Sequence, residues 1–324
     1  MPRARNVPPL LRCVAALLLA CACAPATPGG SDGAVSVSET ADSSDDDTSE
    51  RGSDTTGPAL DLADHGGLGC EKVDLLFVID NSVSMVSEHG NLIASFPEFI
   101  AGIQSTLGGT DSYHVGVITT DAYQFNDPEC RLLGALVTQT GGASSSESEC
   151  GPFLEGRYMT EDDELELGFA CIGQVGLGGA NDERPMQALE LALAEPLQTG
   201  CNAGFLRDDA LLVVVIITDE EDDHTTLQGK LQGSPGNPED WFAALAARKS
   251  VESNVVVLTL IGGLPENTCP FPTGSGAEDS PRLRAFTEMF THGFLGDVCA
   301  WSYGPAFAQA VTVIESACEG FTLP

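Results

Sequence analysis

Oxygen-bearing side chains follow two apolar stretches of the chain. The stretch "DLLFVIDNSVSM" ends its apolar run on Asp80, and Ser82 and Ser84 follow at alternating positions. The most apolar stretch, "LLVVVIIT", leads into "DEEDDH", whose first carboxylate belongs to Asp219. Carboxylate and hydroxyl oxygens are the ligands of hard cations such as Mg²⁺. Asp80, Ser82, Ser84 and Asp219 are therefore candidate ligands of one divalent cation.

Plainer interpretations exist for the polar residues of these segments. An Asp/Ser turn that caps a helix would also explain the first stretch. We expect the other acids of the second stretch, residues 220–223, to form a solvated loop, and His224 to lie on the surface. Glu183 is expected to act at a helix start rather than as a ligand. Trp241 and Trp301 are expected to pack rather than to contact a ligand.

The elements that must position these residues alternate between strands and helices. Apolar runs predict buried strands, and amphipathic or proline-started segments predict helices, with a kink or break at Pro97. The expected strands are 73–79, 113–119, 211–218 and 255–261, and the expected helices are 92–107, 182–197, 238–249, 281–292 and 304–318. This alternation predicts an α/β fold with a doubly wound, mainly parallel sheet.

Two features refine that architecture. Ligands of such sheets bind beyond the carboxyl ends of the strands, where the strand order reverses, and Asp80 and Asp219 each follow a strand. Residues 124–171 interrupt the alternation, and we expect an edge hairpin or loop there, held by a disulfide.

The motifs resemble those of a known family. "FVIDNSVSM" resembles the Asp-x-Ser-x-Ser motif of von Willebrand factor A (vWA) domains, and "VVVIITDEED" resembles the later strand whose aspartate completes their metal-ion-dependent adhesion site. The similarity covers residues 70–324. It implies a Rossmann-like vWA fold and a site in which Asp80, Ser82, Ser84 and Asp219 hold Mg²⁺, or Mn²⁺ or Ca²⁺. It also implies a protein partner that presents a carboxylate to the cation.

One position departs from the family pattern. The family carries a threonine ligand in a Gly-Thr-x-Gly context before a helix, and the matching segment here is Gly176-Leu177-Gly178. Leu177 cannot bind a cation. The resemblance then leaves three outcomes: weak binding, a water in place of the hydroxyl, or a degenerate, metal-free site.

Charge and motifs limit the function. The formal net charge of −34 argues against nucleic-acid binding, because a phosphate backbone needs a basic surface. A phosphatase of the haloacid-dehalogenase type needs a second aspartate two residues after the first, and Ser82 stands there. We therefore predict a binding module rather than an enzyme. A structural vWA domain with a metal-free site is the alternative, and a metal-dependent hydrolase is the least favoured.

The first 20 residues resemble a lipoprotein signal peptide. Three arginines precede the apolar run 14–20, which is too short to span a bilayer. "LLAC" resembles a bacterial lipobox with Cys21 as the lipidated residue; Cys23, or an ordinary signal peptide cut near Ala24 or Ala26, are alternatives. The acidic, Ser-rich segment 21–69 is expected to be a disordered linker. The whole resembles myxobacterial-type vWA lipoproteins anchored by lipid in the cell envelope, at the outer membrane.

The cysteines outside the leader form an even, dispersed set without a CxxC pair. That pattern favours disulfides in an exported chain over a zinc site. Eight cysteines allow many pairings, and we expect residue 70 to pair with 318, 130 with 150, and 269 with 299. The full set is Cys70, Cys130, Cys150, Cys171, Cys201, Cys269, Cys299 and Cys318.

Overall fold

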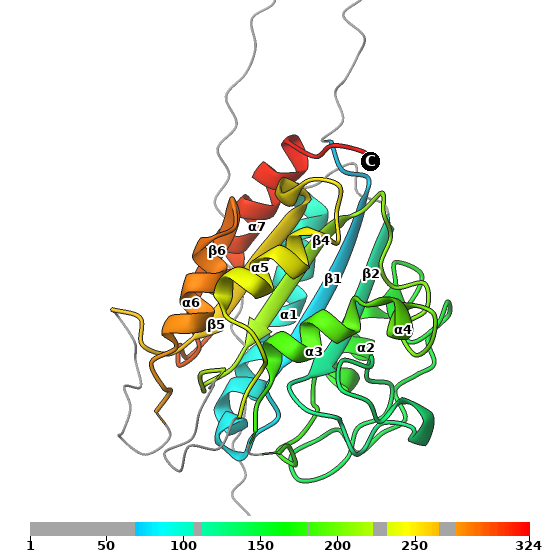
Figure 1. Cartoon of the computed structure of the whole chain (residues 1–324). Helices are drawn as coiled ribbons and strands as arrows, with labels where there is room; N and C mark the ends of the chain where they lie inside the picture. Colours follow the sequence, from blue (N-terminus) through cyan, green and yellow to red (C-terminus); the bar gives the residue numbers. More distant parts are fainter. Residues whose placement is uncertain (1–68, 107–111, 181, 223–231, 266–275) are drawn as a thin grey trace, which may run out of the picture. The chain divides into compact units, whose positions relative to one another are not determined.

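A single sheet forms the centre of the structure (Figure 1). The computed structural model describes residues 69–106, 112–180, 182–222, 232–265 and 276–324, all within one compact unit, Asp61–Pro324. The strand order is β3-β2-β1-β4-β5-β6, and only β3 is antiparallel to its neighbour. The strands are β1 (Lys72–Ile79), β2 (Ser112–Thr119), β3 (Met159–Thr160), β4 (Leu211–Ile217), β5 (Val255–Ile261) and β6 (His292–Asp297).

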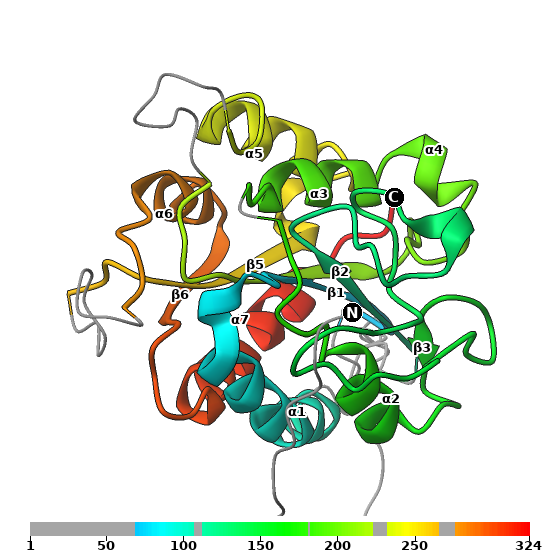
Figure 2. The same ribbon diagram turned by 90° about the horizontal axis from the view of Figure 1, so that it is seen from below.

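Helices cover both faces of this sheet (Figure 2). The layer with α1, α2 and α7 packs on one face, and the layer with α3, α5 and α6 packs on the other. The mainly parallel, doubly wound α/β sheet predicted from the sequence is therefore confirmed. The helices are α1 (Val86–Thr106), α2 (Leu165–Ile172), α3 (Pro185–Ala192), α4 (Glu195–Gln198), α5 (Pro238–Ala246), α6 (Pro281–Glu288) and α7 (Gly304–Glu319), with short 3₁₀ turns η1 (Val83–Met85), η2 (Pro128–Cys130) and η3 (Glu252–Asn254).

The two layers explain why β1 is apolar along nearly its whole length. Successive side chains of a strand point to opposite faces. Phe77 and Ile79 therefore join the α1 and α7 layer, whereas Leu76 and Val78 join the α3 and α5 layer. Burial on both faces fixes the register of β1, and with it the place where Asp80 leaves the sheet.

Two prolines account for differences between the predicted and the observed helices. Pro97 lies inside α1 without ending it, and the aromatic packing of Phe96 and Phe99 on β1 holds that stretch of helix in place. The predicted helix 182–197 is instead two helices. Ala194 adopts an extended backbone between them as the N-cap of α4, and Pro196 lies in the first turn of α4, a position where a missing N–H costs no helical hydrogen bond.

One strand was not predicted. β6 is a sixth strand with the sequence "HGFLGD", which has two glycines and only one buried residue, so it carries little strand signal. Residues 124–171 form the loop excursion expected from the sequence; it contains β3, runs into α2, and is closed by the Cys150–Cys171 disulfide. No helix of the described residues is long and apolar enough to span a membrane.

The disulfides correct one predicted pairing. Cys70 bonds Cys318, as expected. Cys130 bonds Cys201 and Cys150 bonds Cys171, so the expected pair of Cys130 with Cys150 is wrong. The excursion is therefore held to the loop after α4 and to α2. Cys269, Cys21 and the leader lie outside the described residues, as does all of the predicted linker except Gly69.

Candidate metal centre

The register of the two central strands brings the predicted site residues to one edge. Ile79 of β1 pairs with Ile217 of β4, and the backbone N–H of Asp80 donates to the Ile217 carbonyl at 3.0 Å. Asp80 and Thr218 therefore leave the sheet side by side. The chain runs outward from β1 in one direction through β2 and in the other through β4. This is the strand-order reversal at which ligands of such sheets bind.

Asp80 is fully buried and held by neutral donors. Its Oδ1 accepts the backbone N–H of Ser82 at 2.7 Å, and its Oδ2 accepts the Thr218 hydroxyl at 2.7 Å. Burial raises the pKa of Asp80, and these hydrogen bonds only partly offset the effect. The carboxylate is thus oriented mainly by hydrogen bonds, and the charge of the nearby His89 makes the smallest contribution that lowers its pKa.

The two serines connect Asp80 to the second acidic strand end. Ser82 and Ser84 lie at the turn that enters η1, and their hydroxyl oxygens are 3.0 Å apart. The Ser84 hydroxyl then donates to Asp219 Oδ1 at 3.0 Å. The structure therefore brings together all four residues predicted as ligands, although 135 positions separate Ser84 from Asp219.

The electrostatics of this cluster are those of unpaired acids. Burial, followed by the nearby charge of Asp80, raises the pKa of Asp219 to about 7. Among the described residues, no lysine or arginine forms an ion pair with Asp80 or Asp219. Two hydroxyls and two carboxylates without a basic partner fit the preferences of a hard divalent cation.

The described residues do not form a metal site made of His, Cys, Asp and Glu side chains alone. Within the described ranges, no group of three or more His, Cys, Asp or Glu side chains is placed to hold a metal ion. A cation at this edge would therefore depend on the hydroxyls of Ser82 and Ser84 as well as on carboxylates.

The loop before α3 does not place Leu177 as a ligand. The side chain of Leu177 packs against the α1 and α7 layer of the core, and its backbone N–H donates to the Ala143 carbonyl at 2.9 Å. Farther along the same loop, the N–H of Gly179 donates to the Asn81 carbonyl at 2.8 Å. A Cβ at Gly179 would lie 2.6 Å from that oxygen, so this close approach requires glycine.

Glu183, at the end of that loop, lies just before the start of α3, as expected, and is buried. Burial and the charges of Asp80, Glu220 and Asp121, in that order, raise the pKa of Glu183 to about 9. The carboxylate thus faces the same electrostatic environment as the predicted ligands.

Asp121 is a site residue that the sequence analysis missed. It follows β2, which pairs with β1 so that Thr119 is opposite Ile79. Its Oδ1 accepts the Asn81 amide at 3.3 Å, and its Oδ2 accepts the backbone N–H of Ala180 at 3.0 Å. The signal was present in "VITTD", an acid after an apolar run. Asp121 fastens the loop before α3 to the end of β1.

The prediction that residues 220–223 form a solvated loop is wrong for two of them. Glu221 and Asp222 are buried, not solvated. Glu221 accepts the backbone N–H of Arg282 at 2.7 Å, at the start of α6, and Asp222 accepts that of Met186 at 3.0 Å, in the first turn of α3. Both are therefore helix-start acceptors. Asp223 and His224 lie outside the described residues.

The two tryptophans behave differently. Trp241 is buried and its Nε1 donates to the Pro235 carbonyl at 2.7 Å, which confirms the packing role. Trp301 is 92 % exposed, so the packing role expected for it is wrong. Trp301 lies between β6 and α7, on a segment that the Asn91 amide of α1 contacts at the Ala300 carbonyl, 2.9 Å away.

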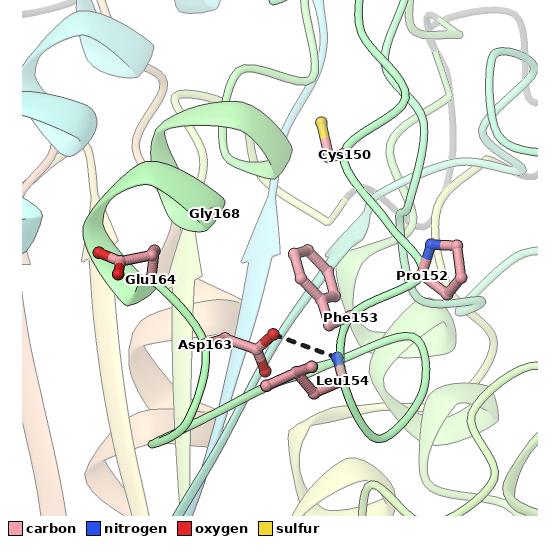
Figure 3. A pocket seen from close by; sticks show the side chains of 7 residues that line it. All are labelled: Cys150, Pro152, Phe153, Leu154, Asp163, Glu164 and Gly168. Carbon is pink, nitrogen blue, oxygen red and sulfur yellow. Dashed lines mark hydrogen bonds between the residues drawn. The ribbon is translucent and has the colours of Figure 1, made fainter.

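A separate hollow lies beside α2 (Figure 3). It has a volume of about 500 Å³ and is open to solvent. The Asp163 carboxylate accepts the backbone N–H of Leu154 at 3.1 Å across it. None of the predicted ligands contributes to its lining, which consists of Cys150, Pro152, Phe153, Leu154, Asp163, Glu164 and Gly168.

Strand order and site position agree with the architecture that the sequence motifs imply. The fold is a mainly parallel, doubly wound α/β sheet with the candidate centre at its strand-order reversal. Among solved structures, the chain is similar to a von Willebrand factor type A protein from Catenulispora acidiphila, with 13 % identity and a TM-score of 0.37 over 75 % of this chain and 42 % of that one. It is also similar to proximal thread matrix protein 1 from the mussel byssus, with 11 % identity and a TM-score of 0.40 over 76 % and 49 %.

Both similarities are partial. The chain spans about half or less of the length of these solved structures. No protein-family model matches the sequence, and no curated protein matches it.

Proposed function

We propose that this chain is a cell-envelope lipoprotein whose vWA-like domain binds a protein partner through a divalent cation. Asp80, Ser82, Ser84 and Asp219 would hold the ion. The observation that carries this proposal is the chain of contacts from Asp80 through both serine hydroxyls to Asp219, at the strand-order reversal and without a basic partner. A bound Mg²⁺ would offer a coordination position to an oxygen of the partner.

Exposed apolar side chains at the same edge support a protein as the partner. Val83 and Val86, beside Ser84, are exposed. Trp301 follows β6, which runs parallel to β5, so it lies at the carboxyl ends of the strands as well. Exposed aromatic and aliphatic residues around a polar centre are typical of protein interfaces, and tryptophan is enriched among the residues that dominate binding energy.

Capture experiments with the full chain test this mechanism. Immobilised protein is exposed to envelope extract in Mg²⁺ or in EDTA, beside the variants Asp80→Ala and Glu166→Ala, the latter a control at an exposed acid of α2. The expected partner is retained by the wild type and the control in Mg²⁺, and lost in EDTA and by Asp80→Ala. Retention that ignores both EDTA and Asp80→Ala would contradict the cation mechanism.

A metal-free interaction domain is the second candidate. It is favoured by the absence, within the described ranges, of three or more His, Cys, Asp or Glu side chains placed to hold a metal. It predicts a partner retained equally in Mg²⁺ and EDTA but lost by Trp301→Ala. Catalysis is not part of either proposal.

The lipid anchor is proposed from "LLAC" alone. Cys21→Ala should move the chain from the membrane fraction to the soluble fraction, whereas Cys23→Ala should leave it in the membrane. The reverse result would assign the anchor to Cys23, and no change in either variant would remove the lipoprotein interpretation.

A further inference from the structure

The hollow beside α2 has an apolar floor. Phe153 is partly buried and packs against the α1 and α7 layer of the core, and Figure 3 shows its ring facing α2. A Cβ at Gly168 of α2 would collide with Met159 and lie 3.3 Å from the Phe153 ring. Glycine at this position therefore lets the aromatic ring lie close to the helix. Cys150, which is bonded to Cys171, lines the same hollow.

Leu154 lies at the rim of this hollow and is 70 % exposed. Its backbone is nevertheless held in place, because its N–H donates to the Asp163 carboxylate at 3.1 Å and the N–H of Phe153 donates to the Gly156 carbonyl at 2.8 Å. The other oxygen of Asp163 accepts the backbone N–H of Thr160 at 2.8 Å. An exposed apolar side chain on a fixed backbone loses little conformational freedom when a partner covers it.

The charge around the hollow is negative. Asp163 and Glu164 belong to its lining, and among the described residues no lysine or arginine does. The nearest arginine in sequence, Arg157, is engaged elsewhere, with the Asp127 carboxylate and with the Leu136 carbonyl at 2.9 Å. Three exposed acids adjoin the lining residues in sequence, namely Glu155, Glu161 and Asp162.

We propose that this hollow is a docking site for a segment of a partner protein that presents an apolar side chain beside lysine or arginine. Its volume of about 500 Å³ lies within the usual range of binding pockets. The floor of Phe153 and Pro152, together with the exposed Leu154, covers the apolar side chain, and the acidic rim pairs with the basic ones.

The same charge disfavours other occupants. A second copy of this chain would bring a surface with 48 acidic against 14 basic residues to an acidic rim. The headgroups of an anionic membrane would be repelled in the same way. The site is also separate from the proposed cation mechanism, because none of the four predicted ligands lines the hollow.

Fluorescence anisotropy with a labelled synthetic peptide tests the apolar contact. The peptide carries a pair of leucines flanked by lysines and is titrated with the full chain, beside an analogue with glutamates in place of the lysines. The wild type should bind the lysine peptide and not the glutamate peptide. Leu154→Ser should raise the dissociation constant about tenfold, whereas Leu132→Ser, at a leucine that is 50 % exposed outside the hollow, should leave it unchanged.

A charge reversal tests the acidic rim. Glu164 is the N-cap residue of α2 but makes no capping hydrogen bond with its side chain, so Glu164→Lys removes no such bond. It should raise the dissociation constant about fivefold. Glu288→Lys makes the same change of charge at an exposed acid of α6 and should have no effect. Equal weakening by the two variants would show that binding follows the net charge alone and would overturn the inference.

The remaining outcomes are equally decisive. All four variants change exposed side chains, so their thermal unfolding midpoints should match that of the wild type. A wild type that does not bind the lysine peptide, or that binds no better than Leu154→Ser and Glu164→Lys, would overturn the inference. In EDTA the affinity should stay the same. An affinity lost in EDTA would place the peptide at the candidate metal centre and would also overturn it, whereas a chain that binds no metal but still binds the peptide would fail the proposed function alone.

Discussion

Two buried aspartates at opposite ends of β1 differ in their charged partners. Asp74 lies near the start of β1 and Asp80 directly follows its end; both are fully buried. The Asp74 carboxylate accepts hydrogen bonds from Arg207, from Nε at 2.7 Å and from the backbone N–H at 2.8 Å. Lys249 Nζ lies 3.8 Å from the same carboxylate. The Asp80 carboxylate accepts hydrogen bonds from the backbone N–H of Ser82 and from the Thr218 hydroxyl, and no lysine or arginine of the described residues pairs with it.

The pKa values follow this difference. Burial raises the pKa of both carboxyl groups, but at Asp74 the opposing causes are led by the charges of Arg207 and Lys249, whereas at Asp80 they are led by neutral hydrogen bonds. The amino end of β1 therefore carries its own counter-charge. The carboxyl end has no lysine or arginine partner among the described residues, and under the proposed function a divalent cation supplies the counter-charge.

We expect the largest loss of stability from breaking the ion pairs of Asp74 with Arg207 and Lys249 at the amino end of β1. Arg207→Met leaves Asp74 buried without its closest basic partner, which should cost about 3–5 kcal/mol of unfolding free energy. Urea denaturation in EDTA and in Mg²⁺ measures it, and Mg²⁺ should not restore the loss. Lys72→Met is the control, since its ion pair with Asp209 is half-exposed, and it should cost at most about 1 kcal/mol. Equal losses would remove the distinction between the two ends.

Metal addition should act at the carboxyl end. At 100 times the dissociation constant, Mg²⁺ or Mn²⁺ should stabilise the wild type by about 2.7 kcal/mol. Asp80→Ala should abolish this gain, while Asp209→Ala, at the exposed pair, should retain it. A wild type whose unfolding midpoint ignores both ions would show that the acids of the carboxyl end need no external counter-charge.

Removing one carboxylate charge should change the stability of the protein in opposite directions at the carboxyl and amino ends of the sheet. In EDTA, Asp219→Asn keeps an acceptor for Ser84 and removes a charge beside Asp80, so it should stabilise the protein by about 1 kcal/mol. Asp74→Asn should destabilise it, because Arg207 and Lys249 lose their counter-ion. Denaturant midpoints measured side by side give both signs, and two destabilising results would contradict the proposed charge imbalance.

The smallest effect concerns Leu177. Because its side chain packs against the core, Leu177→Thr should lower stability by about 1 kcal/mol and change the Mn²⁺ dissociation constant by less than about twofold. A clear gain in affinity would show that residue 177 reaches the centre after all. Calorimetric titration provides both the affinity and its comparison with the wild type.

The sequence predicted what local patterns determine. Asp80, Ser82 and Ser84 follow a continuous apolar run, and Asp219 ends another, so parallel pairing alone brings them to one edge. Glu221 and Asp222 were misjudged because their burial depends on how separate loops pack, which no local pattern encodes. β6 was missed since its two glycines and partial exposure weaken the strand signal. Trp301 was assigned to packing on its apolarity, whereas its place on a loop left it exposed.

The Cys70–Cys318 bond has a mechanical consequence. Cys318 lies in the last turn of α7, and Cys70 lies two residues before Lys72, the first residue of β1. The covalent link joins the end of α7 to the chain just before the central strand, so a pull applied at Cys70 is shared at once by β1 and α7.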